Sequence, residues 1–277
     1  MATYKHFLVD SPIPNVVHVQ INRPQKHNAF YEAMWMELKS IFDTLSTSTD
    51  VRAIVLSGAG PKAFTAGLDV EIAAQGSFGG NKSASDPARA AVAIKRHVAE
   101  FQDCISAIEK CEKPVICVMH GFTFGLGIDM STCADIRICS GDTKFSVKEV
   151  DIGLAADIGT LSRLPKIVGS QSWVKEIALS ARVFGAQEAL QQGFVSQVHE
   201  TKEKAVEAAV KLGELLASKS PVAVQGTKEL LNHARDHTVA DSLRYTGVWN
   251  SAAIQTSDIE KAMLSGLKKT NPRFEKL

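Results

Sequence analysis

Three apolar segments of the chain have the pattern of buried β-strands. They are "NVVHVQI" (15–21), which alternates and is rich in β-branched residues, "VRAIVLSG" (51–58) and "KPVICVMHG" (113–121). The segments 29–46 and 88–111 instead repeat apolar residues at intervals of three and four, which is typical of amphipathic helices. Because parallel strands need crossover connections, this alternation predicts an α/β fold with a mostly parallel sheet.

After about residue 200 the pattern changes to helices alone. Four amphipathic segments follow one another, at 202–218, 221–236, 239–255 and 257–269. We therefore predict a core at 1–200 and a helical C-terminal region at 201–277. The apolar side chains of this region can pack on its own core or on another subunit. We favour another subunit for part of this set: Leu243, Val248, Trp249, Ile254, Met263 and Leu267.

The segment "QGSFGGNKSASDPA" (75–88) is rich in Gly and Ser and predicts a mobile loop. It is either a flap over the neighbouring functional segment or a tolerated surface insertion.

Composition narrows the classes of partner. The 277 residues carry a formal net charge of +1 without a basic stripe, which argues against nucleic acid and favours a small molecule. No apolar run approaches the roughly 20 residues that span a bilayer, and the N-terminus lacks the apolar part of a secretory signal. We therefore expect an intracellular protein without a membrane partner. The five cysteines form no C-x-x-C pair, so we expect neither a disulfide framework nor a metal site.

Two glycine-containing segments follow predicted strands. "AFTAGLDV" (63–70) comes after the strand at 51–58, and "HGFTFGLGIDM" (120–130) leads from the strand at 113–121 into an apolar helix. Helix N-termini present unpaired N–H groups, so two converging junctions could hold one developing oxyanion. Ordinary glycine-rich turns are the alternative. The spacing is not G-x-G-x-x-G, which argues against a dinucleotide site.

Three acidic residues lie downstream in apolar surroundings: Asp129, Glu149 and Asp157. Glu149 lies in a strand-like alternation, and Asp157 lies in the small, apolar run "GLAADIGT". Each could be a helix cap or a surface acid. Alternatively, desolvation could raise the pKa of these carboxyls into the range where they exchange protons.

Four segments in this order resemble the crotonase, or enoyl-CoA hydratase/isomerase, superfamily. They are "NRPQKHNAF" (22–30), "AFTAGLDV", "HGFTFGLGIDMSTCADIRI" and "FSVKEVDIGLAADIGTLSRLPKIVG". The last segment most resembles the dienoyl-CoA isomerases, whose three acids match Asp129, Glu149 and Asp157. The resemblance covers nearly the whole chain.

The resemblance implies a spiral of ββα units with a helical C-terminal trimerisation region, in trimers that often pair into hexamers. It implies an acyl-CoA thioester as the ligand, with no further cofactor and no metal. The oxyanion donors would be the backbone N–H groups of Leu68 and Leu126, the latter at a position where many relatives carry Gly. The other substrate-facing residues would be Lys26, Ala66, Gly67, Asp69, Val70 and Gly125.

The acids distinguish two reactions. A hydratase of this family holds water with two Glu, at the positions of Asp129 and Glu149 here. Asp at 129 is one methylene shorter, by about 1.5 Å, which disfavours hydration. Asp157 adds the second proton-transfer group that an isomerase needs to move a proton from C2 to C6 of a 3,5-dienoyl-CoA. By resemblance, Asp157 is the C2 base and Glu149 the C6 acid, while Asp129 orients or tunes the pair.

Two other functions stay open, a 2-enoyl-CoA hydratase and a CoA-binding or RNA-recruited protein without turnover. The compartment is also open, because the chain ends in "FEKL", which shares only its last two residues with the peroxisomal S-K-L signal. The mitochondrial matrix and the cytoplasm are the alternatives.

Overall fold

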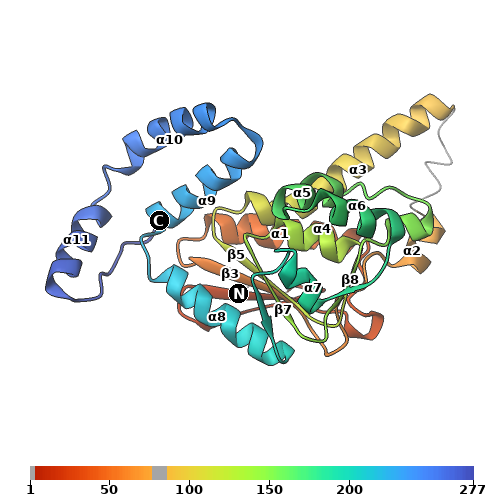
Figure 1. Ribbon diagram of the computed structural model, residues 1–277, viewed down its shortest axis with the longest axis horizontal. Coiled ribbons are helices and arrows are strands. Elements are labelled where there is room, and N and C mark those ends of the chain that lie inside the picture. Colours follow the sequence, from red (N-terminus) through yellow and green to blue (C-terminus); the bar gives the residue numbers. More distant parts are fainter. Residues whose placement is uncertain (1–3, 77–85) are drawn as a thin grey trace.

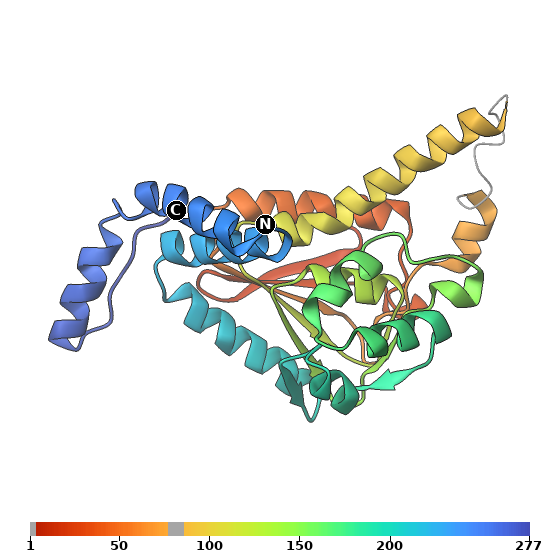
Figure 2. The same ribbon diagram turned by 45° about the horizontal axis from the view of Figure 1, so that its top comes forward.

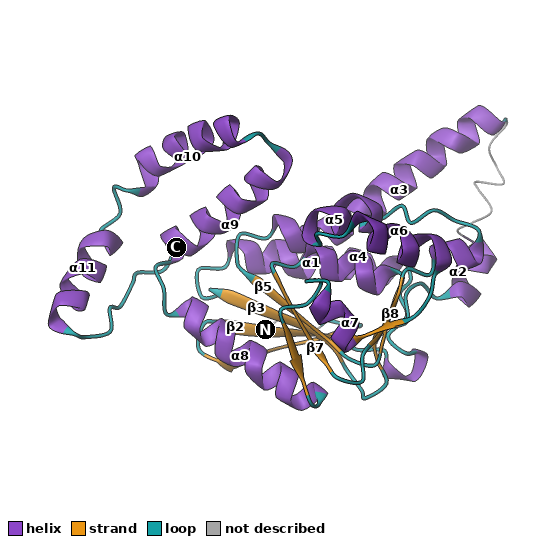
Figure 3. Ribbon diagram, in the orientation of Figure 1, coloured by secondary structure: helices purple, strands orange, loops and turns teal. Residues whose placement is uncertain are grey.

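The computed structural model describes residues 4–76 and 86–277. Its centre is a six-stranded sheet with the order β1-β2-β3-β5-β7-β10 (Figures 1 and 3). β1 pairs antiparallel with β2, and every other pair in this sheet is parallel. The mostly parallel sheet predicted from the sequence is therefore confirmed. The strands are β1 (Phe7–Ile13), β2 (Val16–Ile21), β3 (Ala53–Gly58), β5 (Val115–Met119), β7 (Ile136–Ser140) and β10 (Gln197–His199).

A second sheet of four short strands lies beside the first, in the order β4-β6-β8-β9. Three times the chain runs through a strand of the large sheet and then directly through a strand of the small one, as β3 to β4, β5 to β6 and β7 to β8. Helical segments follow each pair, which gives the expected spiral of ββα units. The short strands are β4 (Ala63–Thr65), β6 (Phe122–Phe124), β8 (Lys144–Ser146) and β9 (Phe184–Gly185).

Helices cover both faces of the large sheet. On one face, α1 (Glu32–Thr47), α3 (Pro87–Lys110) and α4 (Leu126–Cys133) bury the main apolar cluster. The other face is covered by α8 (Lys202–Ala217) (Figure 1). Its Ala205 and Ala209 pack against strand residues such as Val55 and Val118. Alanine allows this helix to approach the sheet closely. The boundary at residue 200 stays a proposal, although α8 covers the sheet of the preceding region.

Shorter helices connect these elements around the small sheet. They are η1 (Pro24–Lys26), α2 (Val70–Gly76), η2 (Glu149–Ile152), α5 (Thr160–Ile167), α6 (Gln171–Ser180) and α7 (Ala186–Gln191). No helix in the two described ranges is long and apolar enough to cross a membrane.

Of the last three helices, the first lies against the core, where its Lys228 pairs with Asp135, and the other two extend away from the sheets (Figure 2). The three are α9 (Pro221–Asp236), α10 (Val239–Ala253) and α11 (Asp258–Lys268). Pro221 begins α9 behind a Ser220 cap, as predicted. Trp249 of α10 packs over Gly226 of α9, where an added Cβ would lie 2.7 Å from the indole nitrogen. Trp249 is therefore covered in part by a helix of its own subunit. The other apolar side chains for which we favoured contact with another subunit are exposed: Leu243, Val248, Ile254, Met263 and Leu267.

The loop predicted at 75–88 falls mainly on residues 77–85, which lie outside the described residues. The described ends of this segment belong to α2 on one side and to the start of α3 on the other.

Candidate active site

The turn between β6 and α4 forms one wall of the site. Gly125 precedes α4 with φ 50° and ψ −111°, a conformation that favours glycine. Leu126 is then the first residue of α4, where the backbone N–H has no acceptor within the helix. No other backbone acceptor contacts it in the described part of the chain. The turn therefore presents a free N–H donor, from a helix whose residues are all buried.

The turn after β4 presents a second donor close to the first. The backbone of Phe30 makes two hydrogen bonds of 2.8 Å here. Its N–H donates to the carbonyl of Gly67, and its carbonyl accepts from the N–H of Asp69. This pairing leaves the intervening N–H of Leu68 on the opposite side of the chain. A Cβ added to Gly67, at φ 97°, would lie 3.8 Å from the nitrogen of Leu126, so the two turns are in contact.

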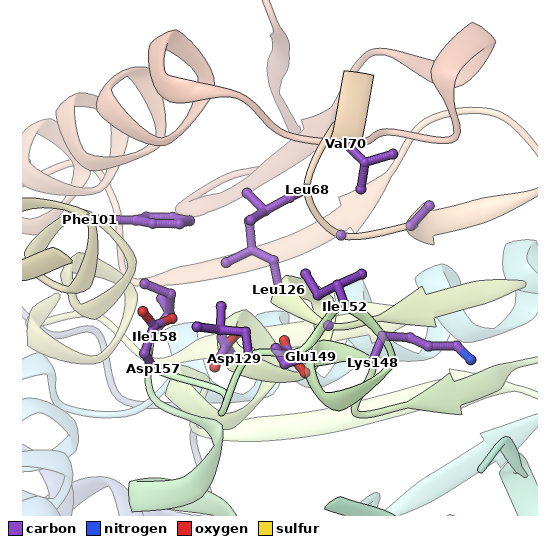
Figure 4. Close-up of a pocket in the computed structure, with 14 residues that line it drawn as sticks. Leu68, Val70, Phe101, Leu126, Asp129, Lys148, Glu149, Ile152, Asp157 and Ile158 are labelled. Carbon is purple, nitrogen blue, oxygen red and sulfur yellow. The ribbon is translucent and has the colours of Figure 1, made fainter. Parts of the chain in front are cut away.

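One cavity collects most of the residues singled out in the sequence. Figure 4 shows the three acids along one side of this acid-lined cavity, with Leu68 and Val70 facing them. The predicted site residues that line it are Ala66, Gly67, Leu68, Val70, Gly125, Leu126, Asp129, Glu149 and Asp157.

Asp129 lies in the first turn of α4 and is 2% exposed. Its Oδ1 accepts two hydrogen bonds from Thr160, from the backbone N–H and from the hydroxyl, both at 2.7 Å. Burial raises the pKa of Asp129 to about 6, while the two hydrogen bonds act against this rise. Asp129 is thus a buried carboxyl that is hydrogen-bonded to Thr160, and not a surface acid.

Glu149 begins η2, and the strand expected around it ends earlier, at Ser146 of β8. The expectation of a strand at Glu149 was therefore wrong, because the chain leaves the small sheet before the acid. Its Oε2 is buried and has no hydrogen-bond partner among the described residues. Burial and then the charge of Asp129 raise the pKa of Glu149 to about 7. A carboxyl in this state carries a proton in a large fraction of molecules at neutral pH.

Asp157 lies in the loop between η2 and α5 and is partly buried. It is not the cap of α5, because that helix begins at Thr160 behind Gly159. Burial raises its pKa, while its own backbone N–H and the nearby imidazole of His97 oppose the rise. The side chain of Gln102 from α3 donates a hydrogen bond of 2.5 Å to its backbone carbonyl. Asp157 also lines a neighbouring apolar cavity, together with Trp35 and Phe101.

Two predicted residues lie outside the acid-lined cavity. Lys26 pairs with Glu71 at 2.8 Å on the surface. Asp69 is buried and pairs with Arg23 at 2.6 Å, and it lines the neighbouring apolar cavity. Contact of Lys26 and Asp69 with a substrate stays a prediction.

Comparison with known proteins identifies the family. The family model for enoyl-CoA hydratase/isomerase matches residues 13–276. The chain belongs to the enoyl-CoA hydratase/isomerase family. A solved structure with this fold is an enoyl-CoA hydratase from Bacillus anthracis, with a TM-score of 0.88 and 26% identity over 98% of this chain and 99% of that one. The crotonase resemblance and the expected fold are thus confirmed.

Two curated family members are more similar in sequence. The mitochondrial Δ(3,5)-Δ(2,4)-dienoyl-CoA isomerase of Mus musculus is 44% identical over 99% of this chain and 84% of its own length. The peroxisomal Δ(3,5)-Δ(2,4)-dienoyl-CoA isomerase of Arabidopsis thaliana is 40% identical over 95% of this chain and 94% of its own.

The structure of this family member adds residues that the sequence did not indicate. Phe101, Lys148, Ile152, Leu154 and Ile158 also line the acid-lined cavity. Phe101 stacks on Trp35 with ring centroids 3.9 Å apart, and both come from helices predicted by their periodicity alone. A helical period identifies the buried face of a helix but does not distinguish core from cavity wall.

No group of three metal-ligating side chains occurs in the described part of the chain. The five cysteines are buried and unbonded. The charged side chains that line the acid-lined cavity are the three carboxyls and Lys148.

Proposed function

We propose that the chain is an isomerase that converts 3,5-dienoyl-CoA into 2,4-dienoyl-CoA, as its curated relatives are named to do. The observation that carries the proposal is the acid-lined cavity. It brings Asp129, Glu149 and Asp157 together with the N–H groups of Leu68 and Leu126, for which no backbone acceptor occurs among the described residues. The proposed enzyme needs no cofactor beyond the coenzyme A of its substrate.

In the first step, the thioester oxygen accepts hydrogen bonds from the N–H groups of Leu68 and Leu126. Asp157 takes a proton from C2, and the electrons of the broken C–H bond pass toward the oxygen to form an extended dienolate. Donors of this kind stabilise a developing oxyanion by roughly 3 to 4 kcal/mol each. Without them, the C2 proton is too weakly acidic for a carboxylate to remove.

In the second step, Glu149 gives its proton to C6. The electrons return from the oxygen, so that double bonds form at C2–C3 and C4–C5 and the product is an isomer of the substrate. Asp157 is then protonated and Glu149 ionised, and exchange with solvent resets both. The pKa of about 7 at Glu149 suits this donor role, because a general acid works best when its pKa lies near the ambient pH.

A 2-enoyl-CoA hydratase is the alternative within the family, and Glu149 is the residue that favours it. Against it stand the shorter carboxyl of Asp129, which is already engaged by Thr160, and the third acid, Asp157. The alternative without turnover would leave two raised carboxyl pKa values without a use.

The test offers the purified protein 3,5-dienoyl-CoA and 2-enoyl-CoA separately and follows the ultraviolet absorbance. We expect the conjugated 2,4-dienoyl band to grow with the first substrate. Loss of the enoyl band with the second substrate alone would support the hydratase, and no change with either would support the function without turnover.

The oxyanion role of Leu126 has its own test. Proline is tolerated at the first position of a helix and removes only its N–H. We expect Leu126→Pro to lower kcat by about 10²- to 10³-fold relative to Leu126→Ala, which loses the same buried side chain but keeps the N–H. Equal rates in the two variants would remove this N–H from the mechanism.

We also propose that the enzyme is a homo-trimer or hexamer. The support is the exposed apolar face of α10 and α11, where Leu243, Met263 and Leu267 are 68%, 67% and 83% exposed. Several large apolar side chains exposed within one helical region favour an interface with another chain. Light scattering is expected to give three or six times the 29.9 kDa of one chain, and a monomer would refute the proposal.

For the compartment, we propose an organelle of the kind named in the curated relatives, a mitochondrion or a peroxisome. Microscopy of the protein fused to a fluorescent protein, alongside markers of both organelles, distinguishes the two.

A further inference from the structure

Thr160 makes an unusual pair of contacts for a residue at the start of a helix. Its backbone N–H and its hydroxyl both donate to the same oxygen, Oδ1 of Asp129, at 2.7 Å each. Thr160 is fully buried, and Asp129 is 2% exposed. These distances are in the range of hydrogen bonds to an ionised carboxylate. Thr160 is thus the partner of a carboxylate that water does not solvate.

We propose that Thr160 is a positioning residue that keeps Asp129 ionised and thereby keeps a proton on Glu149 between turnovers. The inference rests on the isomerase function proposed above, in which Glu149 must donate a proton to C6.

The charge on Asp129 depends on two opposing effects. Burial favours its neutral form, whereas hydrogen bonds donated to the carboxylate favour the charged form. Both hydrogen bonds that its side chain accepts in the described ranges come from Thr160. With them, the pKa of Asp129 is about 6, so the group is mostly ionised at pH 7. Without the hydroxyl, one hydrogen bond fewer counteracts the effect of burial, and the pKa of Asp129 rises.

The charge on Asp129 in turn affects the protonation of Glu149. Its Oε2 is buried without a hydrogen-bond donor among the described residues, and the backbone N–H groups of Lys148 and Glu149 only partly offset the effect of burial on its pKa. After burial, the charge of Asp129 is the largest cause of the raised pKa of Glu149. If Asp129 becomes neutral, Glu149 gives up its proton at a lower pH.

The other charged or titratable groups near Asp129 do not replace Thr160. Asp157, when ionised, has the same sign and favours the neutral form of Asp129, while Glu149 is neutral as long as it holds its proton. Arg163 of α5 favours the charged form but is paired with Glu109 at 3.0 Å. The thiol of Cys133 in α4 stays neutral because burial raises its pKa.

The test compares Thr160→Val, which keeps the branched shape without the hydroxyl, with Thr160→Ser, which keeps the hydroxyl. In the full-length protein, we expect the alkaline fall of kcat/KM in Thr160→Val to move to lower pH by about one unit, the size of a clear coupling between two sites. Thr160→Ser should retain the wild-type profile. A hydroxyl with a merely structural role would change the amplitude of the Thr160→Val profile without moving its alkaline limb.

A Thr160→Val variant that folds and retains the wild-type profile would overturn the proposal, as would an equal displacement in Thr160→Ser. If Thr160→Val does not fold, Thr160→Ala serves the same comparison. If the wild-type protein isomerises no dienoyl-CoA, the proposed function fails first. The proposal then stands or falls on a carbon-13 NMR titration, in which the carboxyl of Asp129 should have a higher pKa in Thr160→Val than in the wild type.

Discussion

Replacing Asp157 by Asn is expected to lower kcat for isomerisation by about 10²- to 10⁴-fold, the usual contribution of a general base. The amide has nearly the same shape but cannot take the C2 proton. The loop that carries it should persist, because Gln102 contacts the backbone carbonyl of residue 157 and not its side chain. The measurement is the initial rate at which the 2,4-dienoyl band appears.

Asp151→Asn is the matched control. Asp151 lies in the neighbouring η2, is exposed and pairs with Lys148 at 2.7 Å, without lining the acid-lined cavity. We expect this variant to isomerise at nearly the wild-type rate. An Asp157→Asn protein that binds the substrate and retains the wild-type rate would exclude Asp157 as a catalytic residue.

Glu149→Gln is expected to reduce isomerisation by a similar factor, about 10²- to 10⁴-fold, but to leave one partial reaction. Because Asp157 is intact, the C2 hydrogen should still exchange with deuterium from heavy water, and Asp157→Asn should lose this exchange as well. Mass spectrometry of the recovered substrate measures it. The opposite pattern, with exchange retained only in Asp157→Asn, would reverse the two roles.

The pH profile gives a second reading of Glu149. A general acid must hold its proton, so the wild-type rate should fall as the pH rises through about 7, the pKa of Glu149. The amide of Glu149→Gln does not titrate, so the residual rate of that variant should lack this alkaline limb. A limb that persists would belong to another group.

The long elements could be predicted from the sequence because each buries one face. The apolar period at 88–111 corresponds to α3 at Pro87–Lys110, and the run at 51–58 to β3 at Ala53–Gly58. The small sheet could not be predicted in this way. Strands such as β4, β6 and β8 have three residues each, fewer than any periodic pattern needs. Their pairing depends on tertiary contacts.

The candidate site, too, could be predicted only in part from the sequence. Its acids could be proposed because a carboxyl in an apolar run is unusual, and a resemblance gave them their roles. Thr160 had no such signal, since its partner Asp129 is 31 residues away and threonine is common at helix starts. Lys228 of α9, which pairs with Asp135 at 2.8 Å, is even further along the chain from its partner. Polar contacts between distant segments leave no periodic trace.

The burial of Asp129 and Glu149 also affects the free energy of unfolding. Both carboxyls have pKa values raised above those of an unfolded chain, so between about pH 4 and pH 7 the native state binds more protons than the unfolded one. Their contribution to the free energy of unfolding therefore falls as the pH rises, by about 1.4 kcal/mol for each unit of raised pKa. At neutral pH these groups oppose folding while they support turnover. Stability and activity are thus opposed at Glu149, and Glu149→Gln should be more stable at neutral pH while it isomerises the substrate far more slowly.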